Sequence, residues 1–409
     1  MATLGSKADS GTAGMRFNDE VLDELLGRVR ELLPMFARNA HKADEERRLP
    51  DENVRALIDA GLLSAMLPAR LGGFGISWSA FCRINGEIAR ACASTAWVYA
   101  IMGSATILSA QAPRHVRAAT FAKGPPTMCG AIAPGGTIEK VEGGYLLNGK
   151  WPWATGCYWA DWVGGSALLK ARDGTLSPGW MWASPKSAVM IEDTWFTTGM
   201  RGTGSSTIVA EEAFLPDHLV TPPGFVAGSE PDPGTPPEPT NAYEFVPMVV
   251  TSKAVITIAA CQAILGHVLA SAGKRKITYT IYDSIADSQV AVAELGKAAA
   301  KIDAAKCLLE RTLGEIDRLA LTGTAVPVAE RAHMRGEAAM VNLLVRDAAD
   351  SLLTVYGTSA FAQPQPIERA WRDINVVSRH GFVNTNICFE AYGRALLGIE
   401  QSSFLSYFL

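Results

Sequence analysis

The chain has 409 residues, of which 48% are hydrophobic, so it can bury a large core without crosslinks. Its formal net charge is -4 and its Lys and Arg residues form no basic cluster, which excludes the electrostatic footprint of a nucleic-acid-binding protein. Seven widely spaced cysteines without a C-x-x-C motif favour neither a disulfide framework nor a zinc site. We therefore expect reduced thiols, no metal and a cytoplasmic protein.

The N-terminal part is predicted to be helical after a short polar tail. Residues 1–15 begin "MATLGSKADSGTAG", contain no apolar run and are expected to form a flexible tail rather than a signal peptide. From Asn18, a candidate N-cap, apolar residues recur every three or four positions, as in helices with one buried face. A further helix, "PDENVRALIDAGLL", is expected to end near Gly61. Residues 16–125 are therefore predicted to form a helical domain.

The middle of the chain has a different pattern. Between residues 126 and 222, short apolar runs are separated by "APGG", "VEGG", "LNGK", "ARDG" and "RGTG", which indicates strands joined by turns. Residues 223–241 are so rich in Pro and Gly that they can form neither a helix nor a strand ladder. The sequence therefore predicts a central β domain followed by a surface connection.

Residues 242–409 return to the helical period. Two long continuous helices are predicted over 288–321 and 329–357, and they are expected to pack into a bundle. Residues 254–272 are nearly long and apolar enough to cross a bilayer, but Gln262 and His267 favour a core helix of the bundle. No membrane association is expected.

The order of helices, β domain and helical bundle is that of the acyl-CoA dehydrogenase superfamily, and three stretches resemble it in the matching places. They are "GGYLLNGKWPWATGCYWADW" (143–162), "GMRGTGSSTIVAEEAFLPDHLV" (199–220) and "VYGTSAFAQPQPIERAWRDINV" (355–376). The resemblance covers nearly the whole chain. It implies an α+β fold with an N-terminal helical domain, a central β-barrel domain, a C-terminal helical bundle and a bound flavin.

A second resemblance concerns the branch of the superfamily. In the commonest branch a catalytic glutamate follows an Arg-Asp pair, and aligning Arg372 and Asp373 on that pair places His380 and Gly381 at that point. "WRDINVVSRH" and "CASTAWVYAIMGS" instead resemble two-component flavin-dependent monooxygenases, similar to the oxygenase components of 4-hydroxyphenylacetate hydroxylases and related aromatic hydroxylases.

This resemblance implies an activity and partners. Reduced flavin (FADH2 or FMNH2), supplied by a separate NAD(P)H-dependent flavin reductase, would react with O2 to a flavin hydroperoxide and hydroxylate a phenol, indole or polycyclic substrate. Such enzymes are homotetramers. Two alternatives stay open: an acyl-CoA dehydrogenase-type FAD oxidoreductase whose base is Glu244, and a non-catalytic flavin-fold binding protein.

The resemblance also assigns candidate residues around the flavin ring. Trp153 and Thr155 are two residues apart on a predicted strand and are therefore expected to face the same side. Trp153 would wall the ring and the Thr155 hydroxyl would reach the nitrogen beside the reactive carbon, although spacing alone equally allows two ordinary strand residues. Trp97 would supply a second dry wall. The ordinary pKa of histidine lies near neutral pH, so His380 is the candidate base or hydrogen-bond anchor.

Two substrate-pocket positions complete this set. Asn384 is expected one turn beyond His380 on the same helix face, with a surface amide as the equal alternative. Many phenol hydroxylases of this type carry a second histidine where this chain has Ala105. The small residue leaves space and removes a polar partner, which favours a bulkier aromatic substrate over a small phenolic acid.

The remaining candidates concern the nucleotide part of the flavin. Gly202, Thr203, Gly204 and Ser205 could cradle a phosphate or a ring edge with backbone amides, although a lone G-x-G motif is weak. Further candidates for the diphosphate and nucleotide, by resemblance, are Arg275, Gln289, Gly357 and Thr358, and such residues often serve a neighbouring subunit. Arg275 and its neighbours Lys274 and Lys276 equally fit a solvated charge cluster, and Arg372 and Asp373 are expected to form a structural ion pair.

Overall fold

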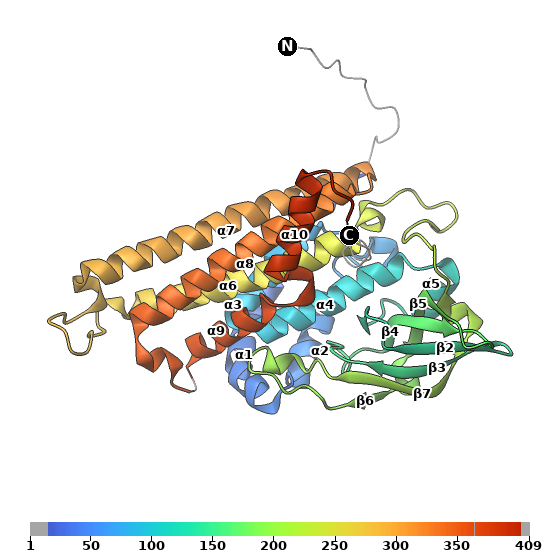
Figure 1. Ribbon diagram of the computed structural model, residues 1–409, viewed down its shortest axis with the longest axis horizontal. Helices are drawn as coiled ribbons and strands as arrows, with labels where there is room; N and C mark the ends of the chain where they lie inside the picture. The colour runs from blue at the N-terminus through green and yellow to red at the C-terminus, as the bar shows by residue number, and fades with distance from the viewer. Residues whose placement is uncertain (1–14, 364, 402–409) are drawn as a thin grey trace, which may run out of the picture.

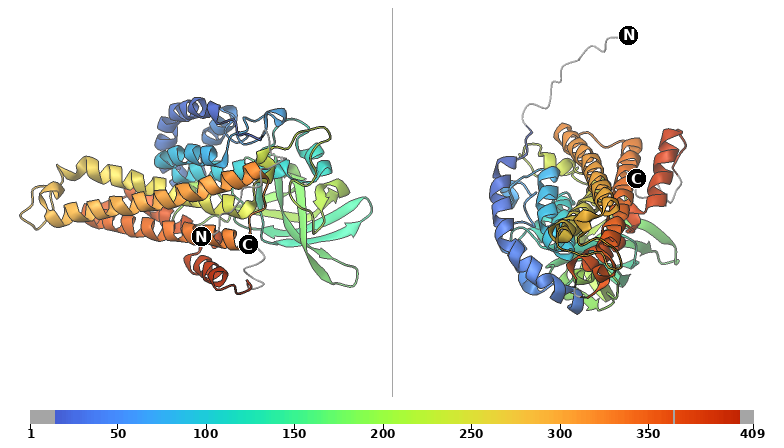
Figure 2. Two further views of the ribbon diagram at one scale, coloured as in Figure 1. Left: turned by 90° about the horizontal axis from the view of Figure 1, so that it is seen from above. Right: turned by 90° about the vertical axis from the view of Figure 1, so that its left-hand side faces the viewer.

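The computed structural model describes residues 15–363 and 365–401. Nearly all of the expected N-terminal tail lies outside these residues. Helices from the first part of the chain pack beside a long helical bundle, and a sheet closes one end of this helical body (Figures 1 and 2). One continuous hydrophobic core joins all three parts.

Five helices precede the sheet: α1 Leu22–Glu46, α2 Asp51–Asp59, α3 Trp78–Ala91, α4 Ala93–Ala110 and α5 Arg114–Thr120. The apolar face predicted for α1 is buried, with Leu25, Val29 and Phe36 inaccessible to solvent. Asn18 lies at the predicted N-cap position, before the 3-10 turn η1 Asp19–Val21 that leads into α1, but its side chain makes no capping bond. The Asp19 carboxylate accepts bonds from the backbone N–H and the hydroxyl of Ser77, which caps α3.

The sheet has eight strands: β1 Met128–Ala131, β2 Gly136–Val141, β3 Gly144–Trp151, β4 Trp162–Lys170, β5 Leu176–Pro185, β6 Met190–Glu192, β7 Thr207–Pro216 and β8 Val220–Thr221. The strand order is β6-β7-β3-β2-β4-β5-β8, and β1 pairs with β4 in parallel. β2 and β3 form an antiparallel hairpin whose turn uses Gly143 at φ 74°. β3 ends at Trp151, and this end faces the helices.

The Pro- and Gly-rich connection after β8 runs over the surface and is tied down by ion pairs. Arg70 binds Asp232 at 2.7 Å and Glu238 at 2.9 Å, and Arg117 binds Asp232 at 2.7 Å. Two separate arginines therefore hold the connection to the N-terminal helices, where the sequence indicates only a segment without regular structure.

The bundle consists of α6 Phe245–Ala272, α7 Gln289–Thr322, α8 Val328–Tyr356, α9 Pro366–Val377 and α10 Thr385–Leu396. α6 passes the length and apolarity test for a membrane span, as does the core helix of many soluble proteins. It packs against α3, α4, α7, α8 and α9, so helices from both halves of the chain cover it (Figure 1). The structure thus gives α6 the position of the central core helix.

The seven cysteines form no disulfide in the described part of the chain. Six are buried, and burial raises the pKa of thiols such as Cys82 and Cys129 well above the ordinary value. Cys307 is the exception, because it lies exposed on α7.

Candidate active site

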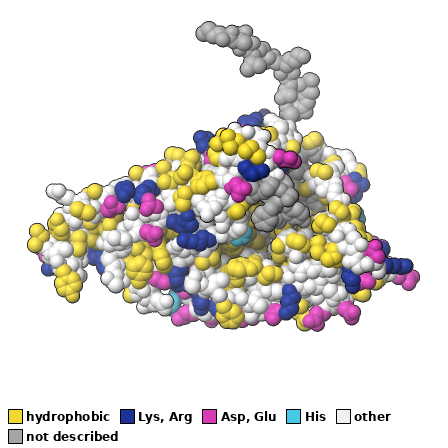
Figure 3. Space-filling view, in the orientation of Figure 1, with side chains coloured by type: hydrophobic (Ala, Val, Ile, Leu, Met, Phe, Trp, Pro, Cys, Tyr) yellow, Lys and Arg dark blue, Asp and Glu magenta, His cyan; other side chains and the backbone are white. Residues whose placement is uncertain are grey.

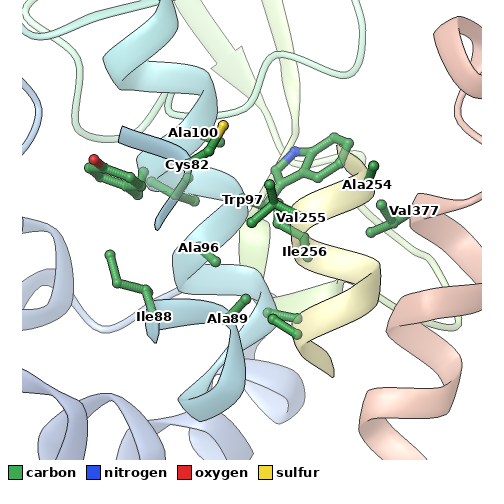
Figure 4. Close-up of a cluster of buried hydrophobic side chains, with 14 of the residues drawn as sticks. Cys82, Ile88, Ala89, Ala96, Trp97, Ala100, Ala254, Val255, Ile256 and Val377 are labelled. Carbon is green, nitrogen blue, oxygen red and sulfur yellow. The ribbon is translucent and has the colours of Figure 1, made fainter. Parts of the chain in front are cut away.

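Three candidate residues meet where α4, the turn after β3 and the segment after α9 come together. The indole Nε1 of Trp97 donates a hydrogen bond to Thr155 Oγ1 at 3.0 Å, and the rings of Trp97 and His380 lie 5.6 Å apart between centroids. Figure 4 shows the Trp97 side chain reaching from α4 toward α6 and α9, beside Ala254 and Val377. The fold therefore gathers residues that are distant in sequence into one largely buried cluster.

Trp153 and Thr155 do not share one face, which corrects the strand prediction. Trp153 lies in a turn beyond the end of β3 and has a left-handed backbone with φ 65°. The Thr155 N–H donates to the Trp153 carbonyl at 3.1 Å, so strand alternation does not apply here. As a result Trp153 is 64% exposed and stands edge-on to Trp195, whereas Thr155 is 4% exposed.

Gly156 explains why this turn can approach α4. It has φ 92°, and a Cβ atom there would lie 2.8 Å from the Met102 side chain of α4. Only glycine combines this backbone conformation with such a close approach. The turn thereby brings the Thr155 hydroxyl within reach of Trp97.

A chain of buried hydroxyl groups continues from Thr155. Its Oγ1 lies 2.6 Å from Ser205 Oγ, which in turn lies 2.8 Å from Thr203 Oγ1. Thr203 Oγ1 donates to the Met200 carbonyl at 2.9 Å. All three hydroxyl-bearing residues are buried. The side chains of Thr203 and Ser205 therefore extend the hydrogen-bond network from Thr155 to the Met200 carbonyl.

The G-x-G segment forms a tight turn in which two of the four predicted amides are already engaged. The N–H groups of Thr203 and Gly204 donate to carbonyls within the same turn, η4 Arg201–Thr203. Gly202 is required for packing instead, because a Cβ atom there would lie about 3 Å from the Cβ atoms of Ala43 and Ser94. This segment therefore joins the sheet to α1 and α4.

His380 caps a short 3-10 turn, η9 Gly381–Val383, rather than lying on a helix. Its Nδ1 accepts the Phe382 N–H at 3.3 Å. Burial lowers the pKa of His380 well below its ordinary value, and the nearby Lys253 lowers it further. The imidazole is therefore neutral near pH 7 with its proton on Nε2, and it is a poor base. Of the two predicted roles, this geometry favours the hydrogen-bond anchor.

Lys253 is a site residue that sequence reasoning missed. It lies on α6, is 1% exposed, and places Nζ 4.7 Å from the centroid of the Trp97 ring, a cation–π geometry. Its ammonium donates to the Val249 carbonyl at 3.3 Å, and burial lowers its pKa to about 7. A lone charge inside the apolar run "VVTSKAVITIAA" was the signal that could have identified it.

The two other predicted pocket positions take no part in the hydrogen bonds and ring contacts of this cluster. Asn384 is exposed and caps α10, where its Oδ1 accepts the N–H groups of Asn386 and Ile387. It does not share a helix with His380, which corrects that expectation. Ala105 lies about two turns beyond Trp97 on α4 and is partly exposed, while its neighbours along the helix are buried.

The expected ion pair between Arg372 and Asp373 is absent from the described residues. Arg372 binds Asp44 at 2.8 Å and Glu368 at 2.6 Å, whereas Asp373 accepts the Met200 N–H. Adjacent residues of a helix point in different directions, so they rarely meet. Burial raises the pKa of Asp373 to about 7.

Glu244 is engaged in structural bonds and does not support the alternative base. It precedes α6, accepts the Val326 N–H at 2.6 Å and binds Arg331 at 2.8 Å. Both contacts tie the start of α6 to the start of α8. The carboxylate is therefore part of the bundle's framework.

A second group of candidates lies at the far end of the bundle. The Arg275 guanidinium stacks on the Tyr356 ring at 3.7 Å, donates to the Tyr356 carbonyl at 2.9 Å and bonds to the Ser359 hydroxyl. Gly357, with φ 87°, and Thr358 follow immediately, and a Cβ at Gly357 would meet open space. Gln289 is exposed at the start of α7, and Lys274 and Lys276 are also exposed.

These two groups are separated by most of α6. Lys253 lies near its start and Arg275 just beyond its end at Ala272, so at 1.5 Å per residue they are roughly 30 Å apart along the helix. A flavin ring and its diphosphate are joined by a short ribityl chain. One chain therefore cannot use both groups for the same flavin.

The residues at the first group suit a flavin ring. A flat, mostly apolar tricycle with a polar rim needs aromatic walls and a few oriented polar atoms. Trp153 offers an exposed aromatic face and Thr155 a buried oxygen, and Trp97 contacts both Thr155 and the neutral His380. The Arg275 guanidinium, beside an open glycine, has the charge and shape that a diphosphate requires.

Comparison with known proteins identifies the family. Models of the acyl-CoA dehydrogenase N-terminal and C-terminal domains match residues 20–113 and 252–385. A pigment production hydroxylase of Rhodococcus sp. is 30% identical over 385 residues, covering 93% of this chain and 97% of that protein. The chain belongs to the flavin-dependent monooxygenases of the acyl-CoA dehydrogenase superfamily.

Two further relatives of this monooxygenase support the assignment. The oxygenase component of the FADH2-dependent resorcinol hydroxylase of Rhizobium sp. is 30% identical, covering 92% of this chain and 94% of that protein. The solved structure of XiaF from Streptomyces sp., in complex with FADH2 and glycerol, superimposes with a TM-score of 0.88 at 30% identity, covering 94% of this chain and 97% of XiaF. The predicted fold class and superfamily are thus confirmed.

Proposed function

We propose that this chain is the oxygenase component of a two-component system that hydroxylates an aromatic or heteroaromatic substrate with reduced flavin and O2. The observation that carries the proposal is the convergence of Trp97, Thr155 and His380 from three separate segments. A separate NAD(P)H-dependent reductase, in the same cytoplasmic compartment, supplies the reduced flavin. The flavin, when bound, supplies the oxygen-transfer chemistry.

The side chains of this chain have three tasks. Trp97 forms a wall of a water-poor space, which protects a reactive cofactor from side reactions, and Trp153, 64% exposed in the single chain, offers its open face to the ring. Thr155 presents its oxygen to the rim of the ring. His380, neutral with a proton on Nε2, donates a hydrogen bond that orients the substrate.

The substrate is proposed to be larger than a small phenolic acid. Ala105 stands on α4 where related phenol hydroxylases carry a histidine, and a methyl group leaves both room and a less polar wall. A panel of hydroxyphenyl acids, indoles and polycyclic phenols tests this size preference. Turnover of the small acids alone would contradict it.

We also propose that the working form is a homotetramer in which a neighbouring subunit contributes Arg275 to the flavin site. The separation of the two groups along α6 supports this arrangement. Exposed apolar side chains beside Arg275, among them Tyr279, Ile281 and Val290, provide a surface for a second copy. Figure 3 shows hydrophobic side chains at this end of the molecule.

The deciding experiment measures product and hydrogen peroxide after reduced flavin, protein and substrate are mixed with O2. We expect hydroxylated product, and we expect His380→Ala to lower the ratio of product to peroxide roughly tenfold, since about 1.4 kcal/mol of orienting hydrogen bonding is lost. His115→Ala, at an exposed histidine, is the control. An unchanged ratio of product to peroxide in His380→Ala would remove His380 from the mechanism. Reduction of an electron-acceptor dye by an acyl thioester would indicate a dehydrogenase in place of the proposed monooxygenase.

A further inference from the structure

We propose that Ser205 and Thr203 fix the direction of the Thr155 hydroxyl and so make the site selective for reduced over oxidised flavin. The inference rests on the proposed function, because it requires the flavin ring to face Thr155. It assigns a task to two buried residues whose side chains lie behind the one expected to touch the ring.

Which of these hydroxyl groups donates and which accepts follows from counting their protons. A hydroxyl group has one proton to donate and two lone pairs to accept with. Thr203 donates its proton to the Met200 carbonyl, so in the contact with Ser205 it must accept. Ser205 therefore donates its proton to Thr203 and must accept a hydrogen bond in its 2.6 Å contact with Thr155.

The same count defines what Thr155 can still do. Its proton is donated to Ser205, and one lone pair accepts the Trp97 indole N–H, a group that can only donate. One lone pair remains. Toward any further partner Thr155 is therefore an acceptor and not a donor.

The two redox states of a flavin differ at the ring nitrogen beside the reactive carbon. Reduced flavin carries an N–H group there, which an acceptor oxygen stabilises. Oxidised flavin carries a lone pair there, which repels a second lone pair. An oriented Thr155 thus favours the reduced state and also holds the proton on that nitrogen.

The series of hydroxyl groups ends at Thr203, whose bond to the Met200 carbonyl disfavours the opposite order of donors and acceptors. The Met200 carbonyl also accepts the Trp195 indole N–H at 3.0 Å, so two donors converge on it. The Met200 N–H donates to the buried Asp373 carboxyl. Reversal would take the Thr203 proton from the Met200 carbonyl and, without a bound flavin, would leave the buried Thr155 proton with no acceptor among the described residues, which costs more than it would in water.

The experiment is an anaerobic titration of the full-length protein with oxidised and with reduced FAD and FMN, giving the ratio of the two dissociation constants. Ser205→Ala removes the acceptor, and the near-isosteric Thr203→Val lets Ser205 turn and donate to Thr155. Both changes release the Thr155 proton toward the ring. We expect oxidised flavin to bind roughly fivefold to tenfold more tightly relative to reduced flavin in both variants.

Ser206→Ala is the matched control, since this neighbouring hydroxyl bonds to Tyr158 and does not belong to the series of hydroxyl groups that starts at Thr155. Its ratio should equal that of the natural protein, and Ser205→Thr should restore the ratio by restoring the hydroxyl. An unchanged ratio in Ser205→Ala and Thr203→Val, or equal weakening of both redox states, overturns the inference while leaving the proposed function intact. Failure of the natural protein to bind either redox state would instead reject the proposed function.

Discussion

Lys253 shows how one residue can set the electrostatics of the site. Its ammonium is enclosed by α4 and α6, has one backbone acceptor, and lies over the Trp97 ring. Its charge also helps to keep His380 neutral. A buried ammonium is costly, because a single cation–π contact of about 2 kcal/mol does not replace its hydration.

The first prediction is that Lys253→Met stabilises the fold. The pKa of Lys253 is lowered to about 7 in the folded protein. Above that pH the unfolded chain holds more protons than the folded one, so the free energy of unfolding rises with pH. The cost of burying the Lys253 charge is therefore full below about pH 7 and fades as the pH rises toward about 10.4. We expect a gain of a few kcal/mol at about pH 6.5 and a smaller gain at about pH 8.5.

Urea unfolding at both pH values measures these gains. Lys123→Met, at an exposed lysine, provides the control and should change stability by less than about 0.5 kcal/mol. A Lys253→Met variant that is less stable than the natural protein at the lower pH would contradict the assignment of a buried, destabilising charge.

Sequence reasoning proposed Trp97, Thr155 and His380 because a resemblance attaches roles to short motifs, and the fold brings these three residues together. It could not place Trp153, because nothing in "KWPWATG" specifies a left-handed backbone at a tryptophan. Lys253 was not predicted, because the residues around it come from helices distant in sequence. Local patterns carry residue identity, but burial and proton direction depend on tertiary contacts.

At the scale of elements, one carboxylate links α7 to the start of α3. Asp317 accepts the backbone N–H groups of Trp78 and Ser79 at 3.1 and 3.2 Å and the Tyr243 hydroxyl at 2.6 Å. These two amides are among those that a helix N-terminus leaves without an internal partner. A residue of the bundle thus caps a helix of the N-terminal part.

Asp317→Ala should therefore lower the free energy of unfolding by about 2–3 kcal/mol, because it leaves buried donors unpaired. Chemical denaturation monitored by circular dichroism gives the value. Asp303→Ala, on an exposed face of the same helix, should stay within about 0.5 kcal/mol of the natural protein. Equal stability of the two variants would show that the cap contributes nothing.

The long helices were the elements best predicted from sequence. The expected helices over 288–321 and 329–357 correspond to α7 Gln289–Thr322 and α8 Val328–Tyr356. Their many turns repeat the helical period, and serine, glycine and proline mark their ends. The strand expected to carry Trp153 and the helix expected to carry His380 and Asn384 fail, since both are short segments decided by packing.

At the scale of the whole molecule, the proposed homotetramer would bring the two groups of candidate residues together at one flavin site. Tyr279→Glu places a charge on the apolar surface beside Arg275, where Tyr279 is fully exposed in the single chain. We expect this change to dissociate the oligomer and to weaken reduced-flavin binding at least tenfold, since the Arg275 contact is lost with the partner.

Light scattering and flavin titration of the same samples check both parts of this prediction. Leu176→Glu, at an exposed apolar residue of β5, should change neither mass nor affinity. A Tyr279→Glu protein that becomes monomeric yet keeps its full affinity would show that each chain binds flavin alone.

The central position of α6 has a consequence for biosynthesis. α3 and α4 emerge from the ribosome first, but the helix that seals their apolar faces is translated only after the entire sheet and the connection. Nascent chains that stop within the sheet therefore leave an open hydrophobic surface, which is a target for chaperones and a cause of aggregation. The N-terminal helical part should consequently not be soluble when it is expressed alone, although it contains five complete helices.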